Sequence, residues 1–309
     1  MAHAIRYARY GGPEVLTLEE VDLPRLEPGQ VRVRVRAAGV NPIDWKVRSG
    51  AFSSAALQQP AGTGMDLAGT IEAVGPGVER WSPGQAVFGK AATGAAATEA
   101  LAEADRLVAK PDWLSFESAA ALPIPAETAV RTLGLLGVGS GHRLLIHAVA
   151  GGVGLVAAQL ALVRGAAVIG TASPARHGFL RELGVDPVSY GEGLEERLRE
   201  AAPAGVDAVL DASGRGVLAV SVELAGSPEK VITIADGSAG EHGVRFSGGG
   251  ADGVPLEEVF AEVLPLLEQG RIRLPVEAVY PLEKTAEAHS LSQEGHLSGK
   301  IVISVDGGE

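Results

Sequence analysis

A short glycine-rich turn is the first feature of the sequence whose residue types suggest chemistry. Its five residues are Ala150, Gly151, Gly152, Val153 and Gly154. They separate an apolar segment at 144–147 from a helix-forming segment at 153–164. Glycines at such a turn let the backbone approach a pyrophosphate, and the N–H groups that open the helix meet its negative charge. The strand–turn–helix context predicts a dinucleotide-binding turn, although Val149 stands where the GxGxxG motif has its first glycine.

The next expected strand, at 167–171, is not followed by a carboxylate. NAD sites usually place Asp or Glu about 20 residues downstream of the glycine turn, where it holds the ribose hydroxyls. This chain has the hydroxyl of Ser173 and the guanidinium of Arg176 there, and both suit a 2′-phosphate. Because no acid would repel that phosphate, the sequence predicts NADP(H) as the cofactor. The alternative for Arg176 is a solvated helix residue without a ligand.

These residues need a scaffold of alternating strands and helices, and the chain has that pattern after residue 143. Strands are expected at 144–147, 167–171, 188–190, 208–210 and 231–234, and helices at 153–164, 175–183, 194–201 and 216–224. The repetition predicts an α/β fold with a Rossmann-type, doubly wound parallel sheet. The charged residues 195–197 are expected on a solvated helix face. Residues 238–254 are predicted to form a loop, followed by an amphipathic helix at 256–269.

Residues 1–120 have short strands and turns instead. Residues 31–36 alternate valine and arginine, which is typical of a strand with one wet face, and residues 67–74 form a second expected strand. Short strands at this spacing predict a small barrel. We expect much of the C-terminal segment to return to this barrel. The predicted domains are therefore residues 1–120 with 271–309, and residues 121–270.

Composition argues against several classes of function. The chain has 309 residues and a formal net charge of −12, with acidic and basic residues interspersed, which argues against nucleic-acid and anionic membrane partners. It has no cysteine, so disulfides and thiolate zinc sites are impossible, and its seven histidines do not form a metal-binding pattern. No apolar run resembles a signal peptide or a membrane span. The sequence therefore predicts a cytoplasmic protein without a bound metal.

Several further motifs occur in order along the chain. They are Ala38-Gly39-Val40-Asn41-Pro42-Ile43-Asp44, Gly64-Met65-Asp66-Leu67-Ala68-Gly69, Ala121-Leu122-Pro123, Glu127-Thr128-Ala129, the glycine turn itself, and Ser298-Gly299-Lys300-Ile301-Val302. With these motifs, essentially the whole chain resembles the medium-chain dehydrogenase/reductase superfamily, in particular its zinc-free quinone oxidoreductase-like branch. The resemblance implies a GroES-like N-terminal barrel domain, a Rossmann NADP-binding domain, a cleft between the two, and a homodimer.

The resemblance also assigns roles to individual residues. It implies that Thr128 approaches the nicotinamide and that Tyr190 lies near the adenosine 2′-phosphate. In zinc-dependent relatives a cysteine ligand occupies the position of Asn41 and a histidine ligand that of Met65. Both replacements therefore indicate a zinc-free member.

Reduction without a metal requires hydrogen-bond donors that stabilise negative charge on a carbonyl oxygen. The catalytic candidates are Asn41, through its amide, Lys46, through its ammonium, and Asp44 between them. Each also has a structural alternative, since Asn before Pro favours a turn and Asp44 could cap a short helix. Asp66 is as readily a structural carboxylate as a catalytic one. Many relatives carry tyrosines where Lys46 and Phe52 stand, so both water and Lys46 remain open as the proton donor.

The sequence thus predicts an NADPH-dependent oxidoreductase that reduces a quinone or an α,β-unsaturated carbonyl (enone) substrate by hydride transfer. One alternative is an enoyl reductase that acts in trans in a biosynthetic pathway. Another is an NADPH-binding sensor protein with little catalysis, and a third, a zinc alcohol dehydrogenase, would need a bound metal. Trp45, Phe52 and Gly248-Gly249-Gly250 are candidates for lining the substrate cleft, but they do not identify the substrate.

Overall fold

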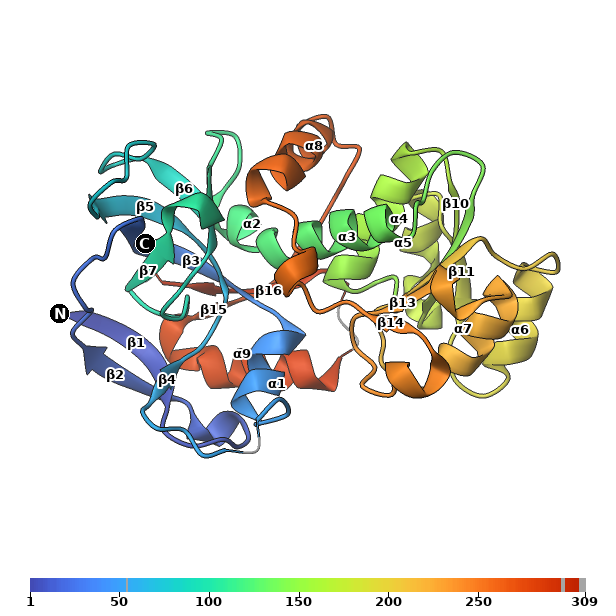
Figure 1. The fold of residues 1–309 in the computed structure, drawn as a ribbon, viewed down its shortest axis with the longest axis horizontal. Helices are drawn as coiled ribbons and strands as arrows, with labels where there is room; N and C mark the ends of the chain where they lie inside the picture. Colours follow the sequence, from blue (N-terminus) through green and yellow to red (C-terminus); the bar gives the residue numbers. More distant parts are fainter. Residues whose placement is uncertain (54, 296–297, 306–309) are drawn as a thin grey trace. The chain divides into compact units, whose positions relative to one another are not determined.

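The computed structural model describes residues 1–53, 55–295 and 298–305 of the chain. The chain forms two compact units, and Figure 1 labels most of their elements. The first unit contains Met1–Ile124, Pro255–Phe260 and the described residues from Leu274 onward. The second unit contains Pro125–Val254 and Ala261–Arg273. Two helices, α3 (Pro123–Leu135) and α8 (Leu256–Glu268), contribute residues to both units.

The first unit is built on two β-sheets. The larger sheet contains β3 (Gln30–Val40), β5 (Asp66–Val74), β6 (Ala86–Lys90), β7 (Glu99–Glu103), β8 (Leu107–Ala109), β15 (Val276–Pro281) and β16 (Lys300–Ser304). The smaller sheet contains β1 (Ala2–Tyr7), β2 (Thr17–Val21) and β4 (Ala61–Gly62), and the helices of the unit are α1 (Pro42–Arg48), α2 (Phe116–Ala120) and α9 (Thr285–Glu294). The order in the larger sheet is β15-β16-β3-β5-β6-β8, and β7 also pairs with β3.

The alternating valines and arginines of β3 explain how this sheet forms. Val31, Val33 and Val35 are buried in the core, as the period-two pattern predicts. Arg34 points to the wet face, where its guanidinium donates to Glu72 on β5 over 2.7 Å. The C-terminal strand β16 then pairs antiparallel with β3, so that the C-terminal segment returns to the sheet built by residues 30–109.

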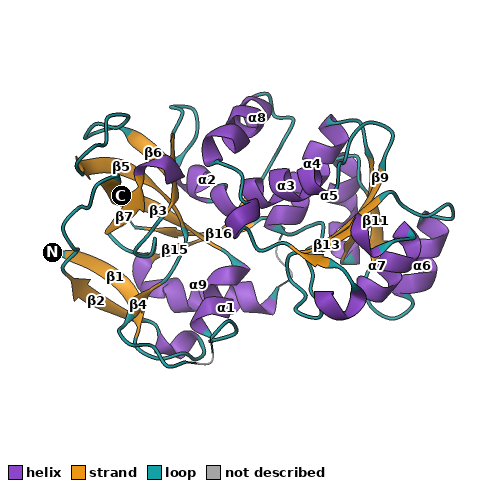
Figure 2. Ribbon diagram, viewed as in Figure 1, coloured by secondary structure: helices purple, strands orange, loops and turns teal. Residues whose placement is uncertain are grey.

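The second unit is a parallel α/β sheet, drawn in orange among purple helices in Figure 2. Its strands are β9 (Arg143–His147), β10 (Ala167–Ala172), β11 (Asp186–Ser189), β12 (Ala208–Asp211), β13 (Val231–Thr233) and β14 (Arg245–Phe246). Its other helices are α4 (Gly152–Val163), α5 (His177–Glu182), α6 (Leu194–Ala201) and α7 (Leu218–Ala225). The predicted Rossmann-type sheet is confirmed.

The strand order of this sheet places a ligand-binding edge at β9. The order is β11-β10-β9-β12-β13-β14. β10 and β11 lie on one side of β9, and β12, β13 and β14 lie on its other side, so the strand order reverses at β9. Open parallel sheets bind ligands at the carboxyl ends of strands where this reversal occurs. The glycine-rich turn follows β9 at that position.

Two segments differ from the sequence-based expectation. Residues 238–254, predicted to be a loop, contain β14, which pairs in parallel with β13, and two short 3-10 turns. The helix expected at 175–183 begins as a 3-10 turn at Pro174–Arg176 before α5, because proline fixes the backbone angle at its first position. None of the helices among the described residues is long and apolar enough to cross a membrane.

Candidate functional site

The turn between β9 and α4 is shaped for close backbone packing. A Cβ on Gly154 would lie 2.5 Å from the carbonyl oxygen of Ala148 and 2.6 Å from the Cα of Val149, so only glycine fits. Val149 itself is fully buried. Its side chain occupies the space above Gly170, where a Cβ would lie 2.4 Å from Val149 Cγ1. The valine in place of the first motif glycine is therefore accommodated by a glycine on the next strand.

The start of α4 has the properties of an anion site. Gly151 is the N-cap residue and supplies no side-chain cap, and the first turn of the helix contains no acidic residue. Glycine at these positions leaves room for a phosphate near the N–H groups, which carry the positive end of the helix dipole. The residues of the turn thus fit the pyrophosphate of a dinucleotide.

A network of buried polar side chains contacts the start of this turn. The N–H of Ala148 donates to Thr171 Oγ1 over 3.1 Å, and this hydroxyl lies 3.3 Å from His147 Nδ1. The other ring nitrogen of His147 lies 3.1 Å from Ser221 Oγ. Burial lowers the pKa of His147 to about 4, so the ring is neutral at pH 7. This arrangement agrees with the structural role expected for His147.

The three residues predicted to recognise a 2′-phosphate lie at one edge of the sheet. Ala172, the last residue of β10, is the register partner of Ser189, the last residue of β11. Ser173 and Tyr190 directly follow these two residues and therefore lie at the same edge. Arg176 ends the 3-10 turn that starts after Ser173. A hydroxyl, a guanidinium and a phenol thus lie at adjacent strand ends.

Arg197 also contacts this edge, whereas Glu195 and Glu196 of the same charged run are exposed, as a solvated helix face predicts. Its Nε donates to the carbonyl of Ser189 over 3.0 Å, and its Nη2 lies 3.4 Å and 3.3 Å from the carbonyl oxygens of Tyr190 and Gly191. The side chain is half-buried. Helical periodicity did not identify these contacts, because the partners are backbone carbonyls at and after the end of β11, six to eight residues away.

Thr128 lies on α3 in the second unit and is buried. Its hydroxyl oxygen lies 3.5 Å from Arg131 Nη2, and its carbonyl accepts a hydrogen bond from Thr132 Oγ1 over 2.7 Å. Its contact with a nicotinamide remains a prediction.

In the first unit, two of the catalytic candidates join a buried charged cluster, which comprises Asn41, Asp44, Asp66 and Lys300. Asn41 Nδ2 donates to Asp66 Oδ2 over 2.9 Å, and Lys300 Nζ donates to Asn41 Oδ1 over 2.5 Å. The backbone N–H of Asn41 donates to Asp44 Oδ2 over 2.8 Å. The amide of Asn41 is therefore held at both ends, with its oxygen toward the ammonium and its nitrogen toward the carboxylate.

Burial dominates the electrostatics of this cluster. All four side chains are at most 4% exposed. Desolvation raises the pKa of Asp44 to about 7, opposed by the N–H of Asn41, and raises the pKa of Asp66 to about 6, opposed by the ammonium of Lys300. Desolvation also lowers the pKa of Lys300, and both carboxylates oppose that effect. Two carboxyl groups thus share one compensating lysine, and the ionisation of each depends on the others.

Zinc does not fit the donors found here. The sequence has no cysteine, and the described residues contain no group of three or more His, Asp or Glu side chains that could hold a metal ion. Met65 is 40% exposed, and the oxygen of Asn41 already accepts from Lys300. Lys46, the third catalytic candidate, lies on α1 outside the cluster, with its ammonium 5.8 Å from the ring centroid of Trp45.

Lys300 was missed as a member of the cluster, since the sequence placed it only within a family motif. A signal was present, because a lysine opens the apolar strand segment Ile301-Val302-Ile303 and lysine is rarely buried without a partner. The partner itself was not visible, because Asn41 lies 259 residues away in the sequence.

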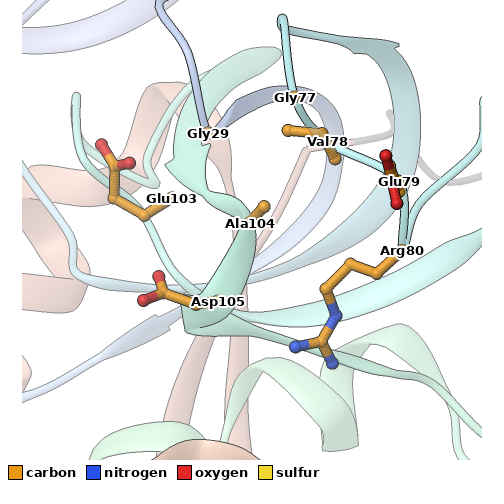
Figure 3. Close-up of a pocket in the computed structure, with 8 residues that line it drawn as sticks. All are labelled: Gly29, Gly77, Val78, Glu79, Arg80, Glu103, Ala104 and Asp105. Carbon is orange, nitrogen blue, oxygen red and sulfur yellow. The ribbon is translucent and has the colours of Figure 1, made fainter.

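A hollow of about 410 Å³ on the first unit contains none of the predicted site residues (Figure 3). Glu79, Glu103 and Asp105 line it together with Arg80, so charges of both signs face it. The guanidinium of Arg80 lies 4.9 Å from the ring of Trp81, whose Nε1 donates to the carbonyl of Ala104. These contacts explain the local packing and give no sign of a ligand.

Comparison with known proteins places this chain in a family. Residues 27–112 match the alcohol dehydrogenase GroES-like domain, and residues 183–303 match the zinc-binding dehydrogenase family. The quinone oxidoreductase of Sus scrofa is 32% identical over 97% of this chain and 97% of its own length. The 2-methylene-furan-3-one reductase of Solanum lycopersicum is 35% identical over 96% of this chain and 77% of its own length.

A polyketide synthase is similar as well, but over a much smaller share of its length. The spectinabilin polyketide synthase system protein NorB of Streptomyces orinoci is 37% identical over 97% of this chain, which spans only 14% of that relative.

Solved structures share the complete fold. The quinone oxidoreductase of Coxiella burnetii superimposes with a TM-score of 0.87 at 31% identity, over 98% of this chain and 99% of that one. A mycobacterial protein solved in complex with NADPH superimposes with a TM-score of 0.87 at 28% identity, over 99% of this chain and 100% of that one. The chain belongs to the medium-chain dehydrogenase/reductase superfamily, in its quinone oxidoreductase-like branch, and is an oxidoreductase.

Proposed function

We propose that the protein uses NADPH to reduce quinones or α,β-unsaturated carbonyl compounds by hydride transfer and without a metal. The observation that carries the cofactor choice is that residues 172–176, at the end of β10, include no carboxylate. Ser173 and Arg176 stand there, at the end of the strand where an NAD site would hold an acid, and Tyr190 follows the neighbouring strand β11. The quinone and enone reductases among its relatives support the substrate class.

When bound, the reduced nicotinamide supplies the hydride. The chain holds the cofactor through the residues of the glycine turn: Ala150, Gly151, Gly152, Val153 and Gly154. Ser173, Arg176 and Tyr190 hold the adenosine 2′-phosphate, and Thr128 orients the nicotinamide. These residues all lie in the second unit.

The charged cluster of the first unit fixes Asn41, the proposed hydrogen-bond donor to an oxygen that becomes negative during reduction. The ammonium of Lys300 and the N–H groups of Asn41 are fixed before any substrate binds, so that little reorganisation is needed. Asp44 holds the backbone of Asn41 and therefore positions it. Lys46, half-buried on the same helix, remains the residue of the predicted set that could pass on a proton.

A steady-state assay tests this function. The purified protein is dialysed against a chelator and mixed with NADPH and a panel of quinones and enones, and NADPH oxidation is followed by absorbance. Turnover that is insensitive to the chelator is expected. Turnover that appears only after zinc is added, or NADPH binding without turnover of any acceptor, would contradict the proposal, and the second result would favour an NADPH sensor.

A second function is supported by the similarity to a segment of a polyketide synthase. An enoyl reductase acting in trans would take an enoyl group carried on a thioester. Adding 2-enoyl thioesters to the same assay distinguishes this function from reduction of free quinones and enones. A trans-acting enoyl reductase would reduce the thioesters with a higher kcat/KM than free enones.

We also propose that the protein is a homodimer. The edge strand β14 offers the backbone of Arg245 and Phe246, both exposed, for pairing with a second copy. Light scattering on the peak eluted from a size-exclusion column should give twice the mass of the chain. The mass of a single chain would refute the dimer.

A further inference from the structure

The second unit contains an ion pair that is almost completely buried. Glu127 and Arg131 lie one turn apart on α3, and Arg131 Nε donates to Glu127 Oε1 over 2.8 Å. Their side chains are 5% and 3% exposed. A buried pair is stable only when its remaining hydrogen-bonding groups are also satisfied. The other contacts of these two side chains therefore identify what the pair holds in place.

Those contacts go to the two ends of one short segment. Arg131 Nη1 donates to the carbonyl of Ser247 over 3.2 Å and also to its hydroxyl. Glu127 Oε1 accepts from the N–H of Val254 over 3.4 Å. A third contact joins Arg131 Nη2 to Thr128 Oγ1. One ion pair thus connects Ser247 and Val254 with the residue assigned to the nicotinamide.

The glycine segment, residues 248–253, lies between these two anchors. Gly249 and Gly250 have φ angles of +88° and +67°, which favour glycine. Among the described residues, and apart from the adjoining residues of the chain, no atom lies within 4 Å of a Cβ built on either one. An ion pair between Arg245 and Asp252, both partly exposed, also reaches the segment. Because the segment has so few side chains of its own, its conformation depends on its anchors.

The glycine segment begins at the ligand-binding edge of the sheet. Ser247 directly follows β14, and its N–H donates to the carbonyl of Thr233, the last residue of β13, over 2.9 Å. The glycine turn leaves the same parallel sheet at the carboxyl end of β9. Ligands of such sheets bind at this edge.

We propose that Glu127 and Arg131 are positioning residues for the nicotinamide half of the cofactor: they hold the glycine segment in one conformation beside Thr128. This inference rests on the proposed NADPH-dependent function. A glycine segment offers a flat ligand mainly backbone groups, and binding to them is weakened when the segment must first be ordered. Loss of the pair should therefore weaken binding of the nicotinamide half and leave the adenosine half unaffected.

The test uses a double variant that removes both charges, Glu127→Gln with Arg131→Met. The control, Arg164→Met with Glu262→Gln, removes a partly exposed ion pair of the same unit. The first measurement is amide hydrogen exchange of residues 247–254 in the cofactor-free protein. The second is the Kd for NADPH and for adenosine 2′,5′-bisphosphate, which carries only the adenosine half of the cofactor.

We expect exchange of residues 247–254 to accelerate and the Kd for NADPH to rise, each about tenfold, the equivalent of one ordinary hydrogen bond. The Kd for adenosine 2′,5′-bisphosphate and both measurements on the control should stay within about twofold of the wild type. Unchanged exchange, an unchanged Kd for NADPH, or equal weakening of both ligands would overturn the inference.

The failure of this inference is distinguishable from that of the proposed function. A wild-type protein that does not bind NADPH would contradict the proposed function, whereas hydrogen exchange would still show whether the pair holds the segment. If the double variant does not fold, Arg131→Lys is used instead. It keeps the charge but cannot contact Glu127 and Ser247 with separate guanidinium nitrogens, so smaller shifts in the same direction are expected, and their absence would overturn the inference.

Discussion

Replacing Lys300 by methionine should strongly destabilise the first unit at alkaline pH. The ammonium donates to the carbonyl of Val40 over 2.7 Å and to Asn41 Oδ1 over 2.5 Å, and it compensates the charges of Asp44 and Asp66. Methionine has a similar length but leaves both acceptors without this donor and both carboxylates without this cation. Removing one partner from a buried charged group costs about 3–5 kcal/mol. We expect a loss of this size in the free energy of unfolding at pH 8.

The stability that Lys300→Met loses should become smaller as the pH falls, because the two carboxyl groups become protonated. Burial raises the pKa of Asp44 to about 7 and that of Asp66 to about 6; Lys300 opposes both shifts, and Lys90 also opposes that of Asp66. Without Lys300 the pKa of both carboxyls should rise further. Carboxyls with a raised pKa in the folded state stabilise it while they are protonated, and this stability is lost as the pH rises through that pKa. The effect of the variant should therefore be smallest at pH 5 and grow toward pH 8.

Urea unfolding at pH 5 and pH 8 measures both effects. Adding Asp66→Asn to Lys300→Met should recover at least half of the loss at pH 8, because the amide oxygen can still accept from Asn41 and no charge remains at that position. Lys284→Met removes an exposed lysine and should cost less than about 0.5 kcal/mol. A loss below about 1 kcal/mol for Lys300→Met, or one that is independent of pH, would refute the reasoning.

Three further outcomes are expected. Arg197→Ala should raise the Kd for NADPH about tenfold and change the Kd for NADH less in a fluorescence titration. Arg199→Ala, on the exposed face of the same helix, should change neither Kd. Equal effects of the two variants would contradict this prediction. Gly154→Ala should cost at least about 2 kcal/mol in thermal unfolding, because its Cβ would overlap the backbone, and a variant as stable as the wild type would show that the turn can adjust. Burial, reinforced by Arg48, lowers the pKa of His289 to about 4, so the free energy of unfolding falls by about 3 kcal/mol as the pH falls from 6.5 to 4. Urea unfolding of His289→Gln should show a smaller loss over that range. An identical loss would refute the lowered pKa of His289.

The fold could be predicted from the sequence where one local pattern determined each element. The alternation in β3 depends only on which side chains face the core, and the glycine turn depends on a strand and a helix that are adjacent in the sequence. Both are as expected in the structure. By contrast, β14 has only two residues, Arg245 and Phe246, both exposed. Its pairing with β13 provides its only signal as a strand, and that pairing is tertiary.

The contacts of the candidate site were less predictable, because they join distant segments. The sequence identified Asn41 and Asp44 as polar residues near a possible site, but not the orientation of the Asn41 amide. Lys300 and Asp66 determine that orientation from other strands. Arg197 shows the same limit, since helical periodicity identifies which face of a helix is polar but not the carbonyls that this face meets.

The segment Pro255–Phe260, which contains the start of α8, belongs to the first unit for a clear physical reason. Phe260 packs edge-on against Phe88 of β6, with ring centroids 4.6 Å apart, and Glu257 pairs with Arg80. A helical pattern alone indicates a buried face but not which core receives it.

Cofactor binding tests the central claim most directly. The purified protein is titrated with NADPH and with NADH by fluorescence, and both titrations are repeated with Arg176→Ala. The account predicts that the wild type binds NADPH at least about tenfold more tightly than NADH and that the variant loses affinity for NADPH only, since a charge-assisted contact to the 2′-phosphate is worth about that factor. Equal affinity for the two cofactors, or an equal loss for both in the variant, would contradict the assignment of a 2′-phosphate site at this edge of the sheet.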